Sequence, residues 1–211
     1  MNTKHPLSGC SFGILGDSYS TFIGHITPGN DCYYPREAVD DVLQVEHTWW
    51  HQLMQRHSMQ LLVNDSYSGA TVCTHLRDGK PPISAFTERV KRSFSGQVQP
   101  DYIFLFGCTN DSWLNRSIGQ VKFADITHED LKQVLPAYCF VLEHLTRCNP
   151  NAKVVALLNT DLHPEIHNGI LTAAAHYGAV AVVLKDIHKQ NGHPSALGMR
   201  QIADQIEAAL L

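Results

Sequence analysis

The sequence has no excess of positive charge. Its 16 lysines and arginines stand against 20 aspartates and glutamates, a formal net charge of −4. This balance gives no electrostatic reason to expect nucleic acid or an anionic membrane as a partner. The sequence also lacks any apolar run of the length that a membrane span requires. We therefore expect a globular protein that binds neither nucleic acid nor a membrane.

The cysteines form no CxxC pair. Six of them are scattered along the chain, at positions 10, 32, 73, 108, 139 and 148. Residues 1–7 have no apolar core, and the first predicted strand follows almost at once, which leaves no room for a signal peptide. We therefore interpret the cysteines as reduced thiols and expect the protein in the cytoplasm.

Five apolar segments of strand length alternate with segments of helical periodicity, and they cover residues 10–15, 60–63, 102–106, 153–158 and 180–184. This alternation predicts an α/β protein whose parallel sheet has helices on both faces. The run at 102–106 is uninterrupted, which is typical of a central strand buried on both faces. The chain shows no repeat or linker, so we expect one domain spanning 1–211.

The helical segments are marked by caps and apolar stripes, with predicted starts near Thr48, Phe86, Thr127, Pro164 and Ser195. Pro136 lies inside the apolar stripe at 131–145, so we expect a kink there or a break into two helices. Residues 19–46 break every regular period. A loop of this length is typical of a lid or a binding loop. We expect further irregular loops at 71–82 and 107–126.

Each predicted strand ends in a cluster of polar residues. Ser18 follows the first strand in the sequence Gly-Asp-Ser-Tyr-Ser, and Gly69, Asn110 and His193 each follow a later strand. The carboxyl ends of parallel strands meet at one edge of a sheet, where α/β proteins bind their ligands. We therefore expect these residues to lie together on one rim.

A serine at this rim is a nucleophile if a base reaches it. His193, held between Gly192 and Pro194, is the candidate base. Gly69 offers a backbone N–H and Asn110 an amide donor for an oxyanion. The sequence around Ser18 is also typical of a simple strand-to-loop turn, so the pentapeptide alone leaves both interpretations open.

The order of the blocks resembles the SGNH (GDSL-type) hydrolases. The matching blocks are Gly-Asp-Ser-Tyr-Ser at 16–20, Gly69, Thr-Asn-Asp at 109–111 and His-Pro at 193–194. The resemblance covers nearly the whole chain. It implies a flavodoxin-like three-layer α/β/α sandwich with a five-stranded parallel sheet.

The resemblance also implies the roles of the site residues. Ser18 would be the nucleophile and His193 the general base. The backbone N–H groups of Ser18 and Gly69 and the side chain of Asn110 would form the oxyanion hole. We predict neither a cofactor nor a metal.

Two positions depart from the family pattern. Cys108 stands where the family usually has a glycine, and its bulk is expected to affect the pocket wall. Gln190 stands where the family has an aspartate three residues before the histidine. Asp186 and Asn191 are therefore both candidates for the third member of the triad, and a backbone carbonyl is the remaining alternative. In a serine protease, replacing the aspartate by asparagine costs roughly 10⁴ in turnover.

The reaction implied is ester hydrolysis through an acyl-enzyme, with a small-molecule ester as substrate. The family acts on acetylated sugars, lipids, thioesters and aryl esters. Tyr33, Tyr34 and Trp113 in the predicted loops are suited to stack on a sugar, although aromatic loop residues also serve as packing. We predict a serine esterase that removes a small acyl group such as acetyl from a carbohydrate or similar alcohol. A lipase or thioesterase is the alternative within the family.

Three functions outside this reaction compete with it. His163 and His167 lie four residues apart on a predicted helix, as metal ligands do, but no third ligand is evident. A binding module without turnover is favoured by the missing aspartate. A flavin- or nucleotide-binding protein is disfavoured because no G-x-G-x-x-G loop follows the first strand. The sequence does not indicate an oligomeric state.

Overall fold

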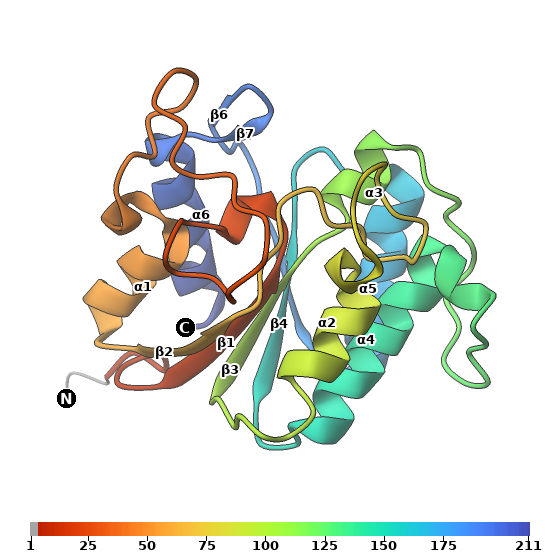
Figure 1. Cartoon of the computed structure of the whole chain (residues 1–211). Helices are drawn as coiled ribbons and strands as arrows, with labels where there is room; N and C mark the ends of the chain where they lie inside the picture. Colours follow the sequence, from red (N-terminus) through yellow and green to blue (C-terminus); the bar gives the residue numbers. More distant parts are fainter. Residues whose placement is uncertain (1–3) are drawn as a thin grey trace.

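A five-stranded parallel sheet lies at the centre of the computed structural model, which describes residues 4–211 (Figure 1). The strands are β1 (Ser11–Gly16), β2 (Gln60–Asn64), β3 (Tyr102–Phe106), β4 (Lys153–Leu158) and β5 (Val180–Val183). Their spatial order is β2-β1-β3-β4-β5, and every pairing is parallel. This is the flavodoxin-like order. The predicted fold class is confirmed.

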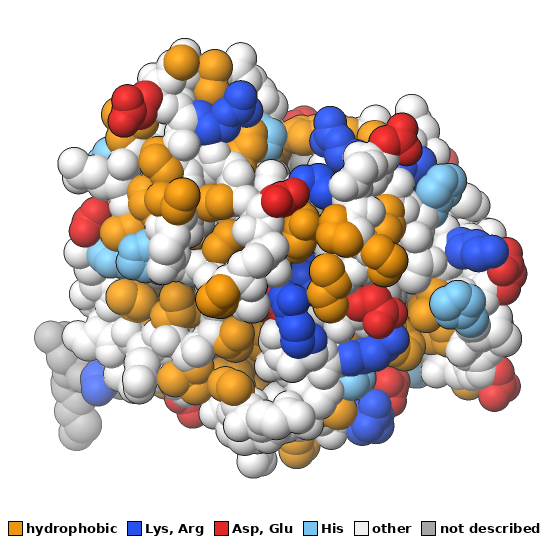
Figure 2. All heavy atoms as spheres, in the orientation of Figure 1, with side chains coloured by type: hydrophobic (Ala, Val, Ile, Leu, Met, Phe, Trp, Pro, Cys, Tyr) orange, Lys and Arg blue, Asp and Glu red, His pale blue; other side chains and the backbone are white. Residues whose placement is uncertain are grey.

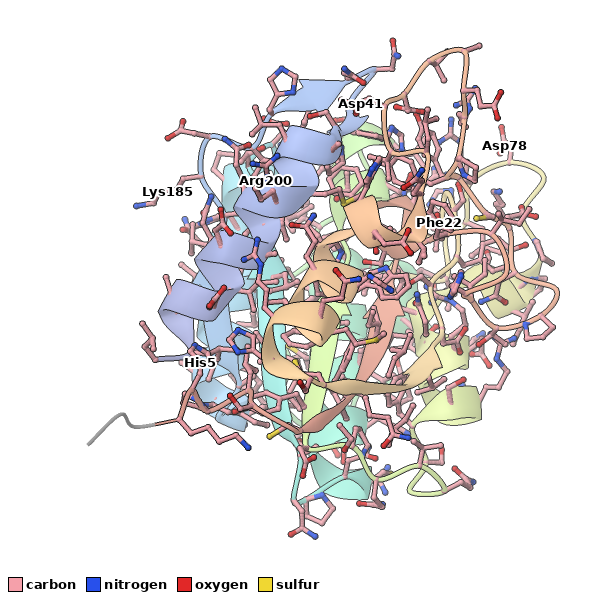
Figure 3. All side chains as sticks on the ribbon, turned by 90° about the vertical axis from the view of Figure 1, so that its left-hand side faces the viewer. His5, Phe22, Asp41, Asp78, Lys185 and Arg200 are labelled. Carbon is pink, nitrogen blue, oxygen red and sulfur yellow. The ribbon has the colours of Figure 1, made fainter. Side chains whose placement is uncertain are left out.

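Helices cover both faces of the sheet. The α-helices are α1 (Trp49–His57), α2 (Phe86–Ser93), α3 (Thr109–Trp113), α4 (Val134–Cys148), α5 (Pro164–Tyr177) and α6 (Ala196–Ala209). The apolar side chains of α1 and α6 pack in one core cluster, and those of α2, α4 and α5 pack in the other. Figure 3 shows α1 and α6 lying side by side on their face, with Arg200 on α6. No helix among residues 4–211 is both long and apolar enough to cross a membrane.

The helix starts predicted at Thr48 and Ser195 are confirmed by their capping contacts, whereas α4 begins at Val134 and not near Thr127. The side chains of Thr48 and Ser195 accept hydrogen bonds from the backbone N–H of His51 and Gly198, at 3.4 and 3.1 Å. Pro164 begins α5, and Gly178 ends that helix in the left-handed conformation with φ of +68°.

Pro136 lies close to a break between two helices, as predicted. The short 3₁₀ helix η4 (Asp130–Lys132) ends before α4 begins at Val134. Pro136 then falls in the first turn of α4, where a backbone N–H has no partner within the helix. The proline is therefore tolerated without a kink inside the helix.

Three further 3₁₀ helices lie in loops, η1 (Ser18–Ser20), η2 (Val45–His47) and η3 (Pro82–Ser84). The structure also contains two elements that the sequence did not predict. The helix α3 occupies part of the segment 107–126, which was expected to be irregular. A short hairpin, β6 (Lys189–Gln190) and β7 (His193–Pro194), follows β5. In Figure 1 the hairpin and α3 both lie at the upper end of the sheet, where the strands end.

The end of β1 is held close to its neighbours. The backbone N–H of Asp17 donates to the carbonyl of Phe106, at 3.1 Å, and so extends the pairing of β1 with β3 by one residue. A side chain on Gly16 would place a Cβ only 2.6 Å from Ser66 Oγ. Glycine is therefore required there, and the next turn presents Ser18 at the carboxyl edge of the sheet.

Candidate active site

Ser18 and His193 meet at the carboxyl edge of the sheet. Ser18 Oγ lies 3.0 Å from His193 Nε2, within hydrogen-bond distance, although 175 residues separate them in the chain. Both side chains are buried. β1 positions the serine and the β6–β7 hairpin positions the histidine. A serine next to a histidine ring is the arrangement that activates a hydroxyl as a nucleophile.

The second ring nitrogen of His193 faces a backbone carbonyl. Its Nδ1 lies 3.2 Å from the carbonyl oxygen of Asn191. The side-chain amide of Asn191 points elsewhere and donates to the carbonyl of Val39, at 2.8 Å. Asp186 is exposed and makes no hydrogen bond to His193 among the described residues. Of the three alternatives left open by the sequence, the backbone carbonyl is the one at hydrogen-bond distance.

The turn of the hairpin explains how that carbonyl comes to face the ring. Asn191 and Gly192 link β6 to β7 and have φ values of +48° and +78°. Two successive positive φ values characterise the tight hairpin turn for which Asn-Gly is the preferred sequence. The turn brings the Asn191 carbonyl and the His193 ring within reach of each other.

Two tyrosines from the segment after β1 anchor the hairpin. The hydroxyl of Tyr19 donates to the carbonyl of Gly192, at 2.6 Å, and that of Tyr34 donates to the carbonyl of Pro194, at 2.7 Å. These bonds fix the backbone on both sides of His193. The segment 19–46 therefore includes supports for the histidine.

Aromatic rings also flank the imidazole directly. The ring of Tyr33 stacks on that of His193 with centroids 3.6 Å apart and an interplanar angle of 8°. Trp113 meets the imidazole edge-on at 5.6 Å and is 41% exposed. Tyr34 is only 1% exposed, so the expectation that it stacks on a sugar is wrong. Trp113 alone of these three combines wide exposure with a place beside the histidine.

A pocket of about 360 Å³ opens above Ser18. Gly69, Asn110 and His193 line it together with the serine, so the predicted site residues share one cavity. The backbone N–H groups of Ser18 and Gly69 donate to no other group among residues 4–211. The amide of Asn110 donates one hydrogen bond to the carbonyl of Ala70, at 3.0 Å, which leaves its second hydrogen available.

Asp111 holds two parts of this pocket together, a role that the sequence analysis missed. Its buried carboxylate accepts hydrogen bonds from the backbone N–H groups of Val72 and Cys73, the shortest at 2.9 Å. These bonds join α3, which includes Asn110, to the loop that includes Gly69. Burial raises the pKa of Asp111, although the backbone donors oppose that effect. The only sequence signal was its place in the Thr-Asn-Asp block.

Cys108 does not take part in the pocket. It is fully buried in the core beside β3 and is not among the residues that line the cavity over Ser18. Its φ of +71° lies in the left-handed region, which explains why a glycine is the usual residue at this position. The expected effect on the pocket wall is therefore absent.

Burial sets the protonation state of the histidine. Desolvation, together with the smaller effect of the nearby charges of Arg36, Lys189 and Arg77, lowers the pKa of His193 to about 4. The hydrogen bond with the Asn191 carbonyl opposes this, because it stabilises the charged ring. At neutral pH the imidazole is therefore uncharged and able to accept a proton.

The neighbouring Asp17 is also perturbed. It is fully buried, and burial raises its pKa to about 7, although the hydrogen bond from the Tyr19 backbone N–H opposes the shift. Its carboxylate caps η1, the turn that holds Ser18. Asp17 thus supports the backbone turn that holds Ser18.

The candidate metal ligands do not converge on this site. His163 Nε2 lies 3.0 Å from Asn115 Oδ1, and neither His163 nor His167 belongs to a group of three close ligand atoms among residues 4–211. Such a group is formed by His5, His57 and Glu207, whose ligand atoms lie within 4.8 Å of one another. Figure 3 shows His5 near the end of α6, far below the hairpin.

The groups around His5 are engaged with one another. The Nδ1 of His5 accepts a hydrogen bond from the Leu7 backbone N–H, and the Nε2 of His5 lies 3.2 Å from the backbone carbonyl of Glu207. The Glu207 carboxylate pairs with Arg56, at 3.0 Å. A cation bound there would have to displace these partners, so we assign no metal to the cluster.

The strand order and the position of the serine at the sheet edge are those of the SGNH hydrolases. A family model for GDSL-like lipase/acylhydrolase matches residues 10–210. The chain therefore belongs to the GDSL-like lipase/acylhydrolase family, whose members hydrolyse esters.

Two solved structures from Bacteroides species resemble the chain over nearly its whole length. One, from Bacteroides ovatus, is described as a GDSL-like lipase. It is 38% identical, with a TM-score of 0.88 over 95% of this chain and 97% of the other. Another, from Bacteroides uniformis and described in the same words, is 37% identical, with a TM-score of 0.87 over 94% and 93% of the two chains. No curated protein matches the sequence.

A more distant solved structure shares the fold. It is a carbohydrate esterase family 2 enzyme with a carbohydrate-binding domain from Corynascus thermopiles. The identity is 16% and the TM-score 0.63, over 97% of this chain and 66% of that one. At this identity the likeness concerns the fold alone.

Proposed function

We propose that the protein is a serine esterase in which Ser18 is the nucleophile and His193 the general base. The observation that carries this proposal is the 3.0 Å separation of Ser18 Oγ and His193 Nε2 inside a pocket at the sheet edge. Ser18 attacks the ester carbonyl while His193 takes its proton. His193 then returns the proton to the leaving alcohol, and water releases the acyl group by the same route.

The oxyanion formed on attack needs preorganised donors. The backbone N–H groups of Ser18 and Gly69 and the remaining amide hydrogen of Asn110 are the donors that we assign to it. Their availability supports the assignment, since the two backbone groups have no other acceptor among the described residues. Such donors stabilise charge that develops only in the transition state.

The Asn191 carbonyl takes the place of a triad aspartate in this scheme. A carbonyl can only accept, so it selects the tautomer with the proton on Nδ1 and leaves the Nε2 lone pair for the serine. An asparagine side chain could instead donate and select the wrong tautomer. The carbonyl lacks a full negative charge, so it stabilises the imidazolium less than an aspartate does.

We propose a small acyl group, such as acetyl, on a carbohydrate or similar alcohol. The exposed ring of Trp113 on the pocket wall supports a sugar, because aromatic faces stack on sugar rings. The test is hydrolysis of p-nitrophenyl acetate by the purified protein. Measurable, saturable turnover is expected, and its absence from well-folded protein would leave a binding site without catalysis.

The pH dependence of the reaction should follow the lowered pKa of His193. Below this pKa the imidazole is protonated and cannot accept the serine proton, so kcat/KM is lost as the pH falls. Because burial lowers the pKa to about 4, activity is expected to persist at pH 5.5, a full unit below the ordinary histidine value. Initial rates from pH 4 to 8 measure this limb. A limb centred at 6.5 or above would show that the ring is not desolvated during catalysis.

Side-chain substitutions near the hairpin should be mild if the backbone orients the histidine. We expect Asp186→Asn and Asn191→Gly each to change kcat/KM by less than about tenfold, against roughly 10⁴ for loss of a triad aspartate. Glycine suits the positive φ at position 191 and keeps the carbonyl. A loss of 10³ or more in either variant would assign the role to that side chain.

A further inference from the structure

The pocket over Ser18 is lined by basic side chains and, among the described residues, by no acidic one. Arg36, Arg77 and Lys80 all contribute to its wall. This is unexpected in a chain whose net charge is −4. Figure 2 shows basic side chains at the upper centre of this face, toward the end of the sheet where β6 and β7 lie, as well as elsewhere on the face.

Two of these side chains lie against the proposed oxyanion donor. If Gly69 had a Cβ, Lys80 Cε would be 2.9 Å from it and Arg77 Cδ 3.6 Å from it. The side chains of both residues therefore lie beside the proposed oxyanion donor in the wall of the pocket. Lys80 is already paired with Asp31, at 2.6 Å, which offsets its charge.

Arg36 approaches the site from the histidine side. Its guanidinium carbon lies 4.9 Å from the centroid of the Tyr33 ring, and Tyr33 stacks on His193. In the proposed mechanism His193 protonates the leaving oxygen, so the alcohol part of the ester lies on this side. Arg36 therefore faces the region that the alcohol would occupy.

Neither arginine has its charge neutralised at close range among residues 4–211, although Asp40 lies near enough to Arg36 for the two charges to interact. No carboxylate among residues 4–211 forms an ion pair with Arg36 or Arg77, whereas Lys80 has one. Both arginines are exposed at the mouth of the pocket. Both line the same pocket as Ser18 and His193. A guanidinium fork matches the geometry of a carboxylate or phosphate.

We propose that the ester bound at Ser18 carries an anionic group, such as a carboxylate, on its alcohol part, and that Arg36 and Arg77 bind this group. The proposal rests on the esterase function proposed above. A field of one sign focused at a pocket also raises the rate at which an oppositely charged substrate arrives. An acetylated uronic acid is a substrate of this class, whereas an acetylated neutral hexose is not.

The test compares two esters that differ only at C6 of the sugar, a mono-O-acetylated methyl glucuronoside with a free carboxylate there and the corresponding acetylated methyl glucoside with a neutral hydroxymethyl group. We expect kcat/KM to be about tenfold higher for the anionic ester, the size of one charge-assisted hydrogen bond. The ratio should fall toward one in Arg36→Gln and Arg77→Gln and at high salt. Arg200→Gln is the matched control, since it removes one exposed charge on α6 outside the pocket, and the ratio should not change.

The proposal would be overturned if kcat/KM for the anionic ester does not exceed that for the neutral ester in the unchanged protein. It would also be overturned if both arginine variants keep the same ratio of these two values. Either result would leave the esterase function unaffected. If neither these esters nor p-nitrophenyl acetate is hydrolysed, the esterase function fails instead. Calorimetric titration of the Ser18→Ala variant with glucuronate and with glucose then decides the charge preference separately. Tighter binding of glucuronate supports the proposal, and equal binding contradicts it.

Discussion

Replacing Ser18 by alanine is expected to lower kcat for ester hydrolysis by on the order of 10⁶-fold, the loss seen when a hydrolase loses its nucleophile. The hydroxyl makes one hydrogen bond, to His193, so its removal should leave the fold intact. Turnover of p-nitrophenyl acetate measures the loss, and thermal unfolding of the same sample measures the stability.

Two controls belong with this variant. Ser117→Ala changes an exposed serine outside the pocket and should retain full activity. The double variant Ser18→Ala/His193→Ala should be no slower than Ser18→Ala, because the two residues act as one unit. A Ser18→Ala protein that keeps a tenth or more of the activity would contradict the proposed mechanism.

Replacing Asn110 by alanine is expected to lower kcat by about 10²–10³-fold with little change in KM. The amide is proposed to bind the oxyanion, which exists only in the transition state, so the ground-state complex should be little affected. Steady-state kinetics separate the two constants.

Asn110 also makes a structural contact, and the effect of losing that contact on stability must be distinguished from the effect on catalysis. Its amide donates to the carbonyl of Ala70, so the variant is expected to lose some stability as well. Measuring rates well below the unfolding temperature removes that effect. A raised KM at unchanged kcat would place Asn110 in substrate binding rather than in the oxyanion hole.

The sheet could be predicted from the sequence because its strands are short apolar runs that end in polar clusters. β3 is buried along its whole length, and its uninterrupted apolar sequence showed this. The β6–β7 hairpin could not be predicted in the same way. Its strands have two residues each, too few to show an alternating pattern, and only the Asn-Gly pair at 191–192 marks the turn.

The four proposed site residues could be predicted to lie together because each follows a strand of one parallel sheet. The partner of His193 Nδ1 could not be predicted, because every residue has a backbone carbonyl and the sequence does not indicate which carbonyl faces the ring. The stacking of Tyr33 on His193 was also missed. It depends on the path of the loop 19–46, which has no periodicity from which to place a ring.

The measurement that tests the central claim most directly is mass spectrometry of the protein after treatment with an organophosphonate, which reacts with an activated serine. The proposed mechanism predicts one label, on Ser18, together with complete loss of esterase activity, and no label in the His193→Ala variant. Labelling at another serine with activity lost in parallel would contradict the assignment of Ser18 as the nucleophile, as would an unlabelled protein that still hydrolyses p-nitrophenyl acetate.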